Sequence, residues 1–417
     1  MLLKFNIITM INTCKTIGCP SFGIKNSKSY RMLDNDEIFC VECGFSFYSL
    51  YESEFNKYKL ESNKNIYKSI GHCSKCGCKN NLIGYGTSTS KKTRRKCLNC
   101  GGVFTSSSGK FDIPDSLKEI NDLIFYGDNI NDYKKFNKVS AKIIGQKLKK
   151  LAILLGKENT FIDKVTYHLN VATEVIFIPY NSSNNTLYVI VSFCIKTGRV
   201  LHLTTNYFAN APLIDDMVYS GNTPLRNVSN DLALEISKKE NEISSRNKFF
   251  DIDYGASMLK KNEVGHIIKP AYAAYRHFDI LNRKLSEIKY INHFIEHESF
   301  IYASCLSSFK EKVINRSCHI YYLRVGEIIN TKSNEKLALK NYWKDTWNIS
   351  KTNNISYAIC NLTSTLNITN PIAPLTQCKF TKYIFEHPFY TQLTKMSAQN
   401  VTLLLDIISV NYNKKLQ

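Results

Sequence analysis

The fold of the larger part of the chain is decided by three neighbouring segments: Glu174-Val-Ile-Phe-Ile-Pro-Tyr180, Leu187-Tyr-Val-Ile-Val-Ser-Phe-Cys-Ile195 and Arg199-Val-Leu-His-Leu-Thr-Thr-Asn-Tyr207. Each is rich in β-branched and aromatic residues, which favour strands. The two links, residues 181–186 and Lys196-Thr-Gly198, are typical turn sequences. We therefore predict three antiparallel strands joined as a meander.

The sequence after the meander predicts strands that alternate with helices. Residues 210–285 are polar and helical or irregular; a strand is expected at 289–295, a helix at 299–315 and a strand at 319–325. Residues 334–347 are compatible with a helix, and the amphipathic stretch Val401–Val410 predicts a helical C-terminal end. This chain order is that of an RNase H-like mixed sheet, so residues 171–417 are expected to form one such domain with a helical insertion.

The sequence before the meander predicts helices. Residues 111–138 contain Pro114 and Gly127 and indicate a linker with one short helix. From Ser140 to Leu155 apolar residues recur at three- and four-residue intervals, and Asn159 can cap a second helix that ends near Leu169. A helix-turn-helix within the segment 111–170 would place Lys164 in a major groove. An ordinary helical hairpin is the alternative.

Eight cysteines near the N-terminus predict two structural zinc sites. The sets are Cys14, Cys19, Cys40 and Cys43 in residues 1–50 (ribbon 1), and Cys73, Cys76, Cys97 and Cys100 in residues 51–110 (ribbon 2). In each set two knuckles are separated by 20 residues, and four thiolates supply the closed tetrahedral shell that structural zinc prefers. Cys78 leaves open which thiolate of the second set is the ligand. Unrelated reduced or disulfide-bonded cysteines are the alternative.

Ribbon 2 carries a basic run that favours a polyanionic partner. Between Gly71 and Lys110 there are eight Lys or Arg and no Asp or Glu. Most of them form a run from Lys91 to Lys96, directly before Cys97, the third cysteine of the second set. A zinc-stabilised hairpin would hold these charges against phosphates. A solvated surface is the alternative. The residues expected to contact DNA in this ribbon are Lys91, Lys92, Arg94, Arg95 and Lys96.

Composition limits the class of protein. The 417 residues suffice for two or three folding units, and 43% hydrophobic residues are typical of a globular chain. The N-terminal apolar stretch lacks the length of a membrane span and the cleavage site of a signal peptide, so we expect a cytoplasmic protein without membrane association. The sequence contains no Walker loop, nucleophile elbow or dinucleotide fingerprint.

Several motifs together resemble the zinc-ribbon insertion-element transposases of bacteria. They are Cys14-x4-Cys19-Pro-x-Phe-Gly, Phe39-Cys40-x2-Cys43-Gly-x-Ser-Phe, and Gly84-Tyr-Gly with Arg95-Lys-Cys-x2-Cys-Gly, followed by the helical pair and the meander. Segments 271–281 and 294–306 are also similar to parts of such proteins. The resemblance covers most of residues 14–325 and is strongest in the ribbons.

The resemblance implies a DDE-type transposase or nuclease with an RNase H-like core that uses Mg²⁺ or Mn²⁺ for strand transfer. The three acidic ligands would fall at Glu174 on the first strand, Glu296 at the end of the fourth, and Glu335 on a later helix. The family pattern has Asp at the first two positions, and Glu displaces the carboxylate by one methylene. A degenerate member without activity is therefore the alternative.

Three functions follow as hypotheses. The first is a DNA-binding transposase-like protein that is active if the carboxylate site is intact. Its expected partner is double-stranded DNA, and its expected location is the nucleoid if the chain is bacterial. Whether it forms a homo-oligomer stays open. The second is a catalytically inactive zinc-ribbon DNA-binding protein, either a regulator or a domesticated remnant. The third is a zinc-scaffolded protein-interaction module.

Overall fold

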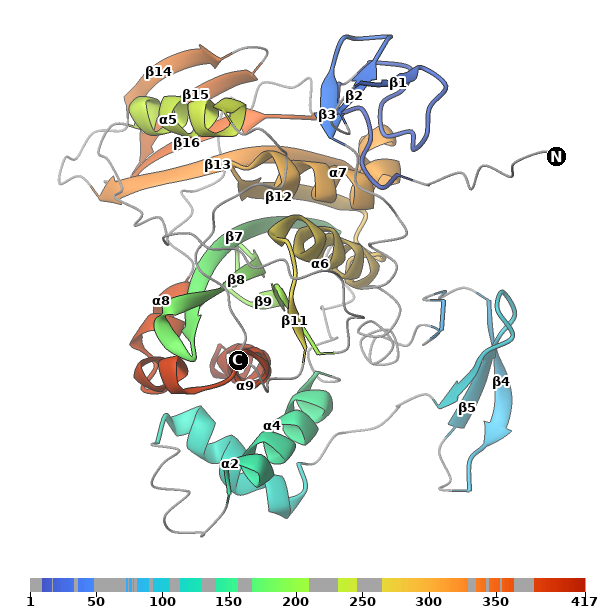
Figure 1. Cartoon of the computed structure of the whole chain (residues 1–417), viewed down its shortest axis with the longest axis vertical. Helices are drawn as coiled ribbons and strands as arrows, with labels where there is room; N and C mark the ends of the chain where they lie inside the picture. The colour runs from blue at the N-terminus through green and yellow to red at the C-terminus, as the bar shows by residue number, and fades with distance from the viewer. Residues whose placement is uncertain are drawn as a thin grey trace.

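The computed structural model describes residues 10–16, 18–33, 37–48, 73, 75–76, 78, 81–89, 93–105, 113–128, 140–156, 167–209, 232–245, 265–328, 335–342, 345–352, 355–363 and 379–416. These residues form a mixed α/β structure around one large sheet, with two small three-stranded sheets nearer the N-terminus (Figure 1).

The large sheet has eight strands in the order β14-β15-β16-β13-β12-β7-β8-β9. Strand β7 pairs antiparallel with β8 and parallel with β12, which in turn pairs parallel with β13. The remaining pairs are antiparallel, so that β14, β15 and β16 extend the sheet beyond β13. The bounds are β7 (His168–Tyr180), β8 (Ser182–Cys194), β9 (Val200–Thr205), β12 (Tyr290–Glu296), β13 (Cys318–Ile328), β14 (Glu335–Tyr342), β15 (Asp345–Thr352) and β16 (Ile355–Asn361).

Helices cover both faces of this sheet and create two apolar cores. One face packs against α5 (Leu232–Ser245), α6 (Pro270–Lys284) and α7 (Ser299–Ile314). The other packs against α8 (Lys379–Glu386), the short 3₁₀ helix η3 (Tyr390–Lys395) and α9 (Ala398–Lys415), and α2 (Asp115–Tyr126) and α4 (Ala141–Leu155) pack against α9. A two-stranded sheet of β10 (Tyr207–Phe208) and β11 (His266–Ile267) joins the end of the meander to α6. Because α2 and α4 share a core with the meander, they belong to the same folded body as the sheet.

A chain of buried polar side chains crosses the sheet beneath α6. His277 contacts Ser192 at 2.8 Å and Thr204 at 3.1 Å, and Ser192 continues to Thr173 at 2.5 Å. Thr173 in turn contacts His293 at 2.8 Å. At the two ends, His202 contacts Thr204 at 3.1 Å and Cys305 contacts His293 at 3.5 Å. Each buried hydroxyl and ring nitrogen of this chain thus has a partner, which removes most of the cost of burying it.

The predicted meander is confirmed, as are the strand that becomes β12, helix α7 and strand β13. The helix expected over 334–347 is wrong, because this segment forms β14 and the start of β15. The alternation of Lys336 and Lys340 with Leu337 and Leu339 also fits a strand, and pairing with the next segment stabilises that choice. The second helix of the proposed helix-turn-helix does not extend to Leu169, since β7 begins at His168; residues 157–166, including Lys164, lie outside the described residues.

Candidate metal centres and nucleic-acid interface

The four cysteines of ribbon 1 converge on one point. The Sγ atoms of Cys14 and Cys43 lie 3.4 Å apart and those of Cys19 and Cys40 lie 3.7 Å apart. All four Sγ atoms lie within 4.8 Å of one another. Zinc–sulfur bonds of about 2.3 Å in a tetrahedron require an S–S separation of about 3.8 Å, and a disulfide requires about 2.0 Å. The geometry therefore fits a closed four-thiolate metal site.

The second set, in ribbon 2, has the same geometry. Cys73 and Cys100 have their Sγ atoms 3.5 Å apart, and Cys76 and Cys97 have theirs 3.6 Å apart. Cys78 is not a member of this group. Its backbone carbonyl accepts from the Cys73 N–H at 2.8 Å, and its thiol accepts from Asn99 Nδ2 at 3.2 Å. The structure thus assigns the ligand position to Cys76.

Local backbone geometry explains why these cysteines meet. The C-terminal knuckles place Gly44 and Gly101 at φ values of 73° and 66°, where residues with a Cβ are strained. Each glycine N–H donates to the carbonyl of the first cysteine of its knuckle at 2.9 Å. After each knuckle a short strand returns, β3 (Ser46–Tyr48) in ribbon 1 and β6 (Val103–Thr105) in ribbon 2.

Without a cation the ligand thiols differ in how readily they ionise. Burial raises the pKa of the Cys14 thiol well above its usual range, and burial raises that of Cys76 to about 12. Burial opposes ionisation of Cys43 as well, but hydrogen bonds with the Thr16 hydroxyl and the Phe45 backbone lower its pKa to about 7. A bound divalent cation would remove the penalty of crowding four thiolates, so metal binding and thiol deprotonation are coupled.

Ribbon 1 is attached to the sheet domain through α7. Lys15 Nζ donates to the Ser299 carbonyl at 3.2 Å, and Ser307 Oγ donates to the Ile11 carbonyl at 3.2 Å. Ile11 also belongs to the core beneath α6 and α7. In Figure 1 ribbon 1 lies beside α7, whereas ribbon 2 lies to the side of the main sheet. The two ribbons therefore have different surroundings despite the same metal geometry.

The basic residues of ribbon 2 lie on both faces of its three-stranded sheet. Strands β4 (Leu82–Thr87), β5 (Thr93–Cys97) and β6 pair antiparallel. Arg94 and Lys96 lie on one side of β5 with Tyr85, each with its charge 5.6 Å from the centre of the tyrosine ring. Arg95 lies on the other side, level with Phe104. Lys91 and Lys92 lie outside the described residues.

The predicted catalytic residues do not all come together. Glu296 ends β12, and the parallel register that pairs Thr173 with Ile295 puts it next to Glu174 on β7. Glu335 begins β14, and three strands separate β14 from β12. At about 4.8 Å per strand, this places the backbone of Glu335 at least about 19 Å from that of Glu296 and further still from Glu174. The expectation that Glu335 lies on a helix near the other two is wrong, because residues 335–342 form an edge strand instead.

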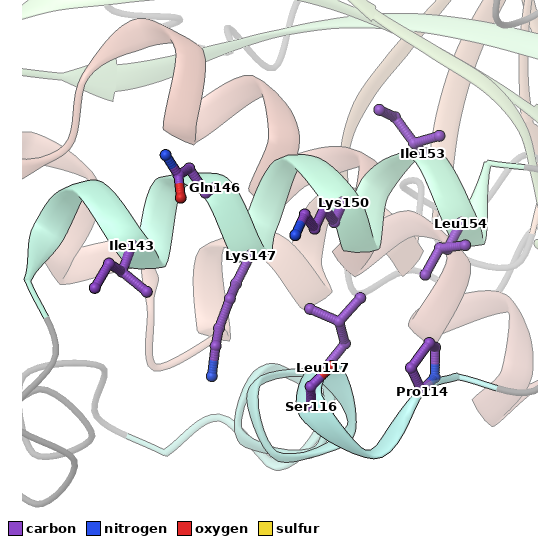
Figure 2. Close-up of a pocket in the computed structure, with 9 residues that line it drawn as sticks. All are labelled: Pro114, Ser116, Leu117, Ile143, Gln146, Lys147, Lys150, Ile153 and Leu154. Atoms are coloured by element: carbon purple, nitrogen blue, oxygen red, sulfur yellow. The ribbon is translucent and has the colours of Figure 1, made fainter.

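Helix α4 presents a second basic surface. Its buried side packs on α9, while Lys142, Lys149 and Lys150 are exposed. Between α2 and α4 lies a groove of about 550 Å³. Figure 2 shows Ile143, Ile153 and Leu117 lining it, with Lys147 and Lys150 on the α4 side. The helical periodicity predicted α4 correctly, but it could not show that α2 would complete this groove.

None of the described helices combines the length and the apolar character that a bilayer crossing requires. No family model, curated protein or solved structure matches the chain. The functional conclusion therefore depends on the motifs and geometry of the chain itself.

Proposed function

We propose that the chain is a zinc-ribbon DNA-binding protein of the transposase type that lacks strand-transfer activity. The observation that carries the proposal is ribbon 2, where a four-cysteine site holds a basic strand in a segment of forty residues without Asp or Glu. Zinc would supply the folding energy that so small a core cannot, and the rigid strand would hold its cations against phosphates. Double-stranded DNA is the expected partner.

The strand order supports an RNase H-like core. Numbered by their order along the chain, β9, β8, β7, β12 and β13 lie in the sequence 3-2-1-4-5 within the large sheet. The first and fourth strands are parallel, the fourth and fifth are parallel, and the meander is antiparallel. Helix α7 connects the fourth strand to the fifth.

Strand transfer by Mg²⁺ or Mn²⁺ needs at least a third acidic ligand. Within the part of the chain that the structure describes, the groups of three or more metal-ligating side chains are the two cysteine sets. Glu174 and Glu296 form a pair, and Glu335 is too distant to join them. This favours the inactive DNA-binding protein over the active transposase.

The groove between α2 and α4 favours a second candidate, the zinc-scaffolded protein-interaction module. Its apolar lining and lysine rim would match an acidic amphipathic segment of a partner. The two candidates differ in their response to salt, because DNA binding releases counterions from the duplex.

The test is a fluorescence anisotropy titration of the full-length, zinc-loaded chain with a labelled duplex at several NaCl concentrations. We expect affinity to fall steeply with salt, to be lost in Cys97→Ser, and to be retained in Cys78→Ser, which keeps all four ligands. Absence of any salt-dependent duplex affinity would reject DNA binding in favour of the interaction module.

A further inference from the structure

One surface of ribbon 2 combines aromatic, apolar and basic side chains. Strands alternate their side chains between two faces, so that Leu82, Cys97 and Phe104 surround the metal site. The opposite side, called here the outer face, consists of Ile83 and Tyr85 on β4, Arg94 and Lys96 on β5 and Val103 on β6. Tyr85 is 47% exposed, and Ile83 and Val103 are also exposed.

A β-bulge orients the Tyr85 side chain toward Arg94 and Lys96. Gly84 pairs with Arg95 and Thr87 pairs with Thr93, so Tyr85 and Gly86 both stand opposite Arg94. Gly86 has a φ of 68°, which the bulge requires and which side chains with a Cβ rarely adopt. The result is a ring with the Arg94 guanidinium and the Lys96 ammonium each 5.6 Å from its centre.

The neighbours of Tyr85 along its strand are Gly84 and Gly86, which carry no side chains that could crowd the tyrosine. The apolar side chains Ile83 and Val103 continue the surface on either side of Lys96, with which both are paired.

These features select one class of ligand. A duplex hides the faces of its bases and would use only the cations, which leaves the exposed ring and the two apolar side chains unexplained. An unpaired nucleotide offers a base face to stack on an aromatic ring and a phosphate for the neighbouring cations. The absence of Asp and Glu between Gly71 and Lys110 means that no carboxylate within this segment repels that phosphate.

We propose that the outer face of ribbon 2 binds single-stranded nucleic acid, with Tyr85 stacking on a base and Arg94 and Lys96 contacting adjacent phosphates. The proposal rests on the nucleic-acid binding proposed above and specifies the strand state that this ribbon prefers. It gives the ribbon a role at opened or terminal DNA, where unpaired bases are available.

The test compares a labelled single strand of about 20 nucleotides with the matching duplex, using the full-length zinc-loaded chain and anisotropy at several salt concentrations. Tyr85→Ala should weaken single-strand binding at least about 5-fold without changing the salt slope, and Tyr85→Phe should bind as the parent does, because stacking needs the ring alone. Arg94→Gln with Lys96→Gln should weaken binding and reduce the magnitude of the salt slope by about 1.4, at about 0.7 per contact. Tyr126→Ala, which removes a 73% exposed tyrosine from α2, is the matched control and should have no effect.

The outcomes separate the two proposals. Undiminished single-strand binding in Tyr85→Ala, with duplex binding retained, would overturn this inference and leave DNA binding intact. Failure of the parent chain to bind either nucleic acid would reject both, and capture of an acidic peptide on this face in place of nucleic acid would do the same. Zinc content measured for each variant shows whether the ribbon has stayed folded.

Discussion

Glu174 on β7 and Glu296 on β12 lie side by side on one face of the sheet, one residue beyond the Thr173–Ile295 pair. Their outer neighbours at the same level are apolar, Val191 on β8 and Leu323 on β13. Helix α8 contacts Glu174, to whose Oε2 its Thr381 hydroxyl donates at 3.2 Å. Both glutamates are half-buried, so the pair has the register of a metal site but lies among apolar neighbours.

The first prediction is that Mg²⁺ and Mn²⁺ do not bind this pair in the native state. A site occupied at 100 times its Kd would stabilise the fold by about 2.7 kcal/mol, which thermal unfolding detects easily. We expect neither ion at millimolar concentration to shift the Tm of the parent chain. We also expect no ion-dependent shift in the Tm of Glu174→Gln. Glu386→Gln, on the exposed side of α8, is the control. Metal-dependent nicking of a plasmid by the parent chain, lost in Glu174→Gln, would restore the active transposase.

More of the sheet than of the carboxylate site could be predicted from the sequence, for a physical reason. The strands of the meander carry their signal in local composition, and short turns join them, so pairing of neighbours in the chain follows from the residues themselves. The separation of Glu335 from Glu296 depends on the pairing of β14 with β15 and of β15 with β16. Local periodicity does not encode such pairing, and residues 334–347 are compatible with both a helix and a strand.

The two cysteine sets were predicted from their spacing, which could not decide between Cys76 and Cys78 as the ligand. Tyr85 was missed as a site residue, although Gly84-Tyr-Gly86 was visible in the sequence, because its orientation depends on a bulge whose register only the structure supplies. The buried histidines give no sequence signal of their shared network, since His202, His277 and His293 come from three separate elements.

The second prediction is that freshly prepared reduced protein holds two zinc ions per chain. Four thiolates in each ribbon have tetrahedral separations, and small ribbons fold only with their metal. Cys76→Ser should reduce the zinc content, measured by elemental analysis, from two to one. Cys78→Ser should keep two, because Cys78 lies outside the ligand set. Less than one zinc per chain in the parent would contradict the assignment.

The third prediction concerns the basic run. Neutralising Lys91, Lys92, Arg94, Arg95 and Lys96 together should weaken binding to all duplex sequences to a similar extent, because phosphate contacts position a protein without reading bases. Each lost contact should reduce the slope of log K against log salt by about 0.9. Neutralising Lys142, Lys149 and Lys150 on α4 tests the second basic surface in the same titration. An unchanged affinity and slope in the first variant would exclude ribbon 2 as the DNA contact.

The fourth prediction is that the sheet domain loses stability in acid through its buried histidines. Burial lowers the pKa of His293 to about 3, and burial together with the nearby charges of Lys284 and Arg276 lowers those of His202 and His277 well below 6.5. A histidine in the unfolded chain titrates near 6.5. Below that pH the unfolded state therefore binds protons that the native state does not, so the stabilisation is complete above pH 6.5 and is lost as pH falls toward 3.

Three such groups give a slope of up to about 4 kcal/mol per pH unit, at 1.36 kcal/mol for each proton. Urea unfolding followed by the fluorescence of the buried Trp347 between pH 7 and pH 5 measures it. His293→Gln keeps a hydrogen-bonding partner for Thr173 but cannot titrate, so its slope should be smaller by about one proton even if its stability at pH 7 is lower. A zinc-sensitive dye in the same samples separates metal release by the ribbons from unfolding of the sheet. A slope identical to that of the parent would mean that His293 does not contribute to the acid sensitivity of the fold.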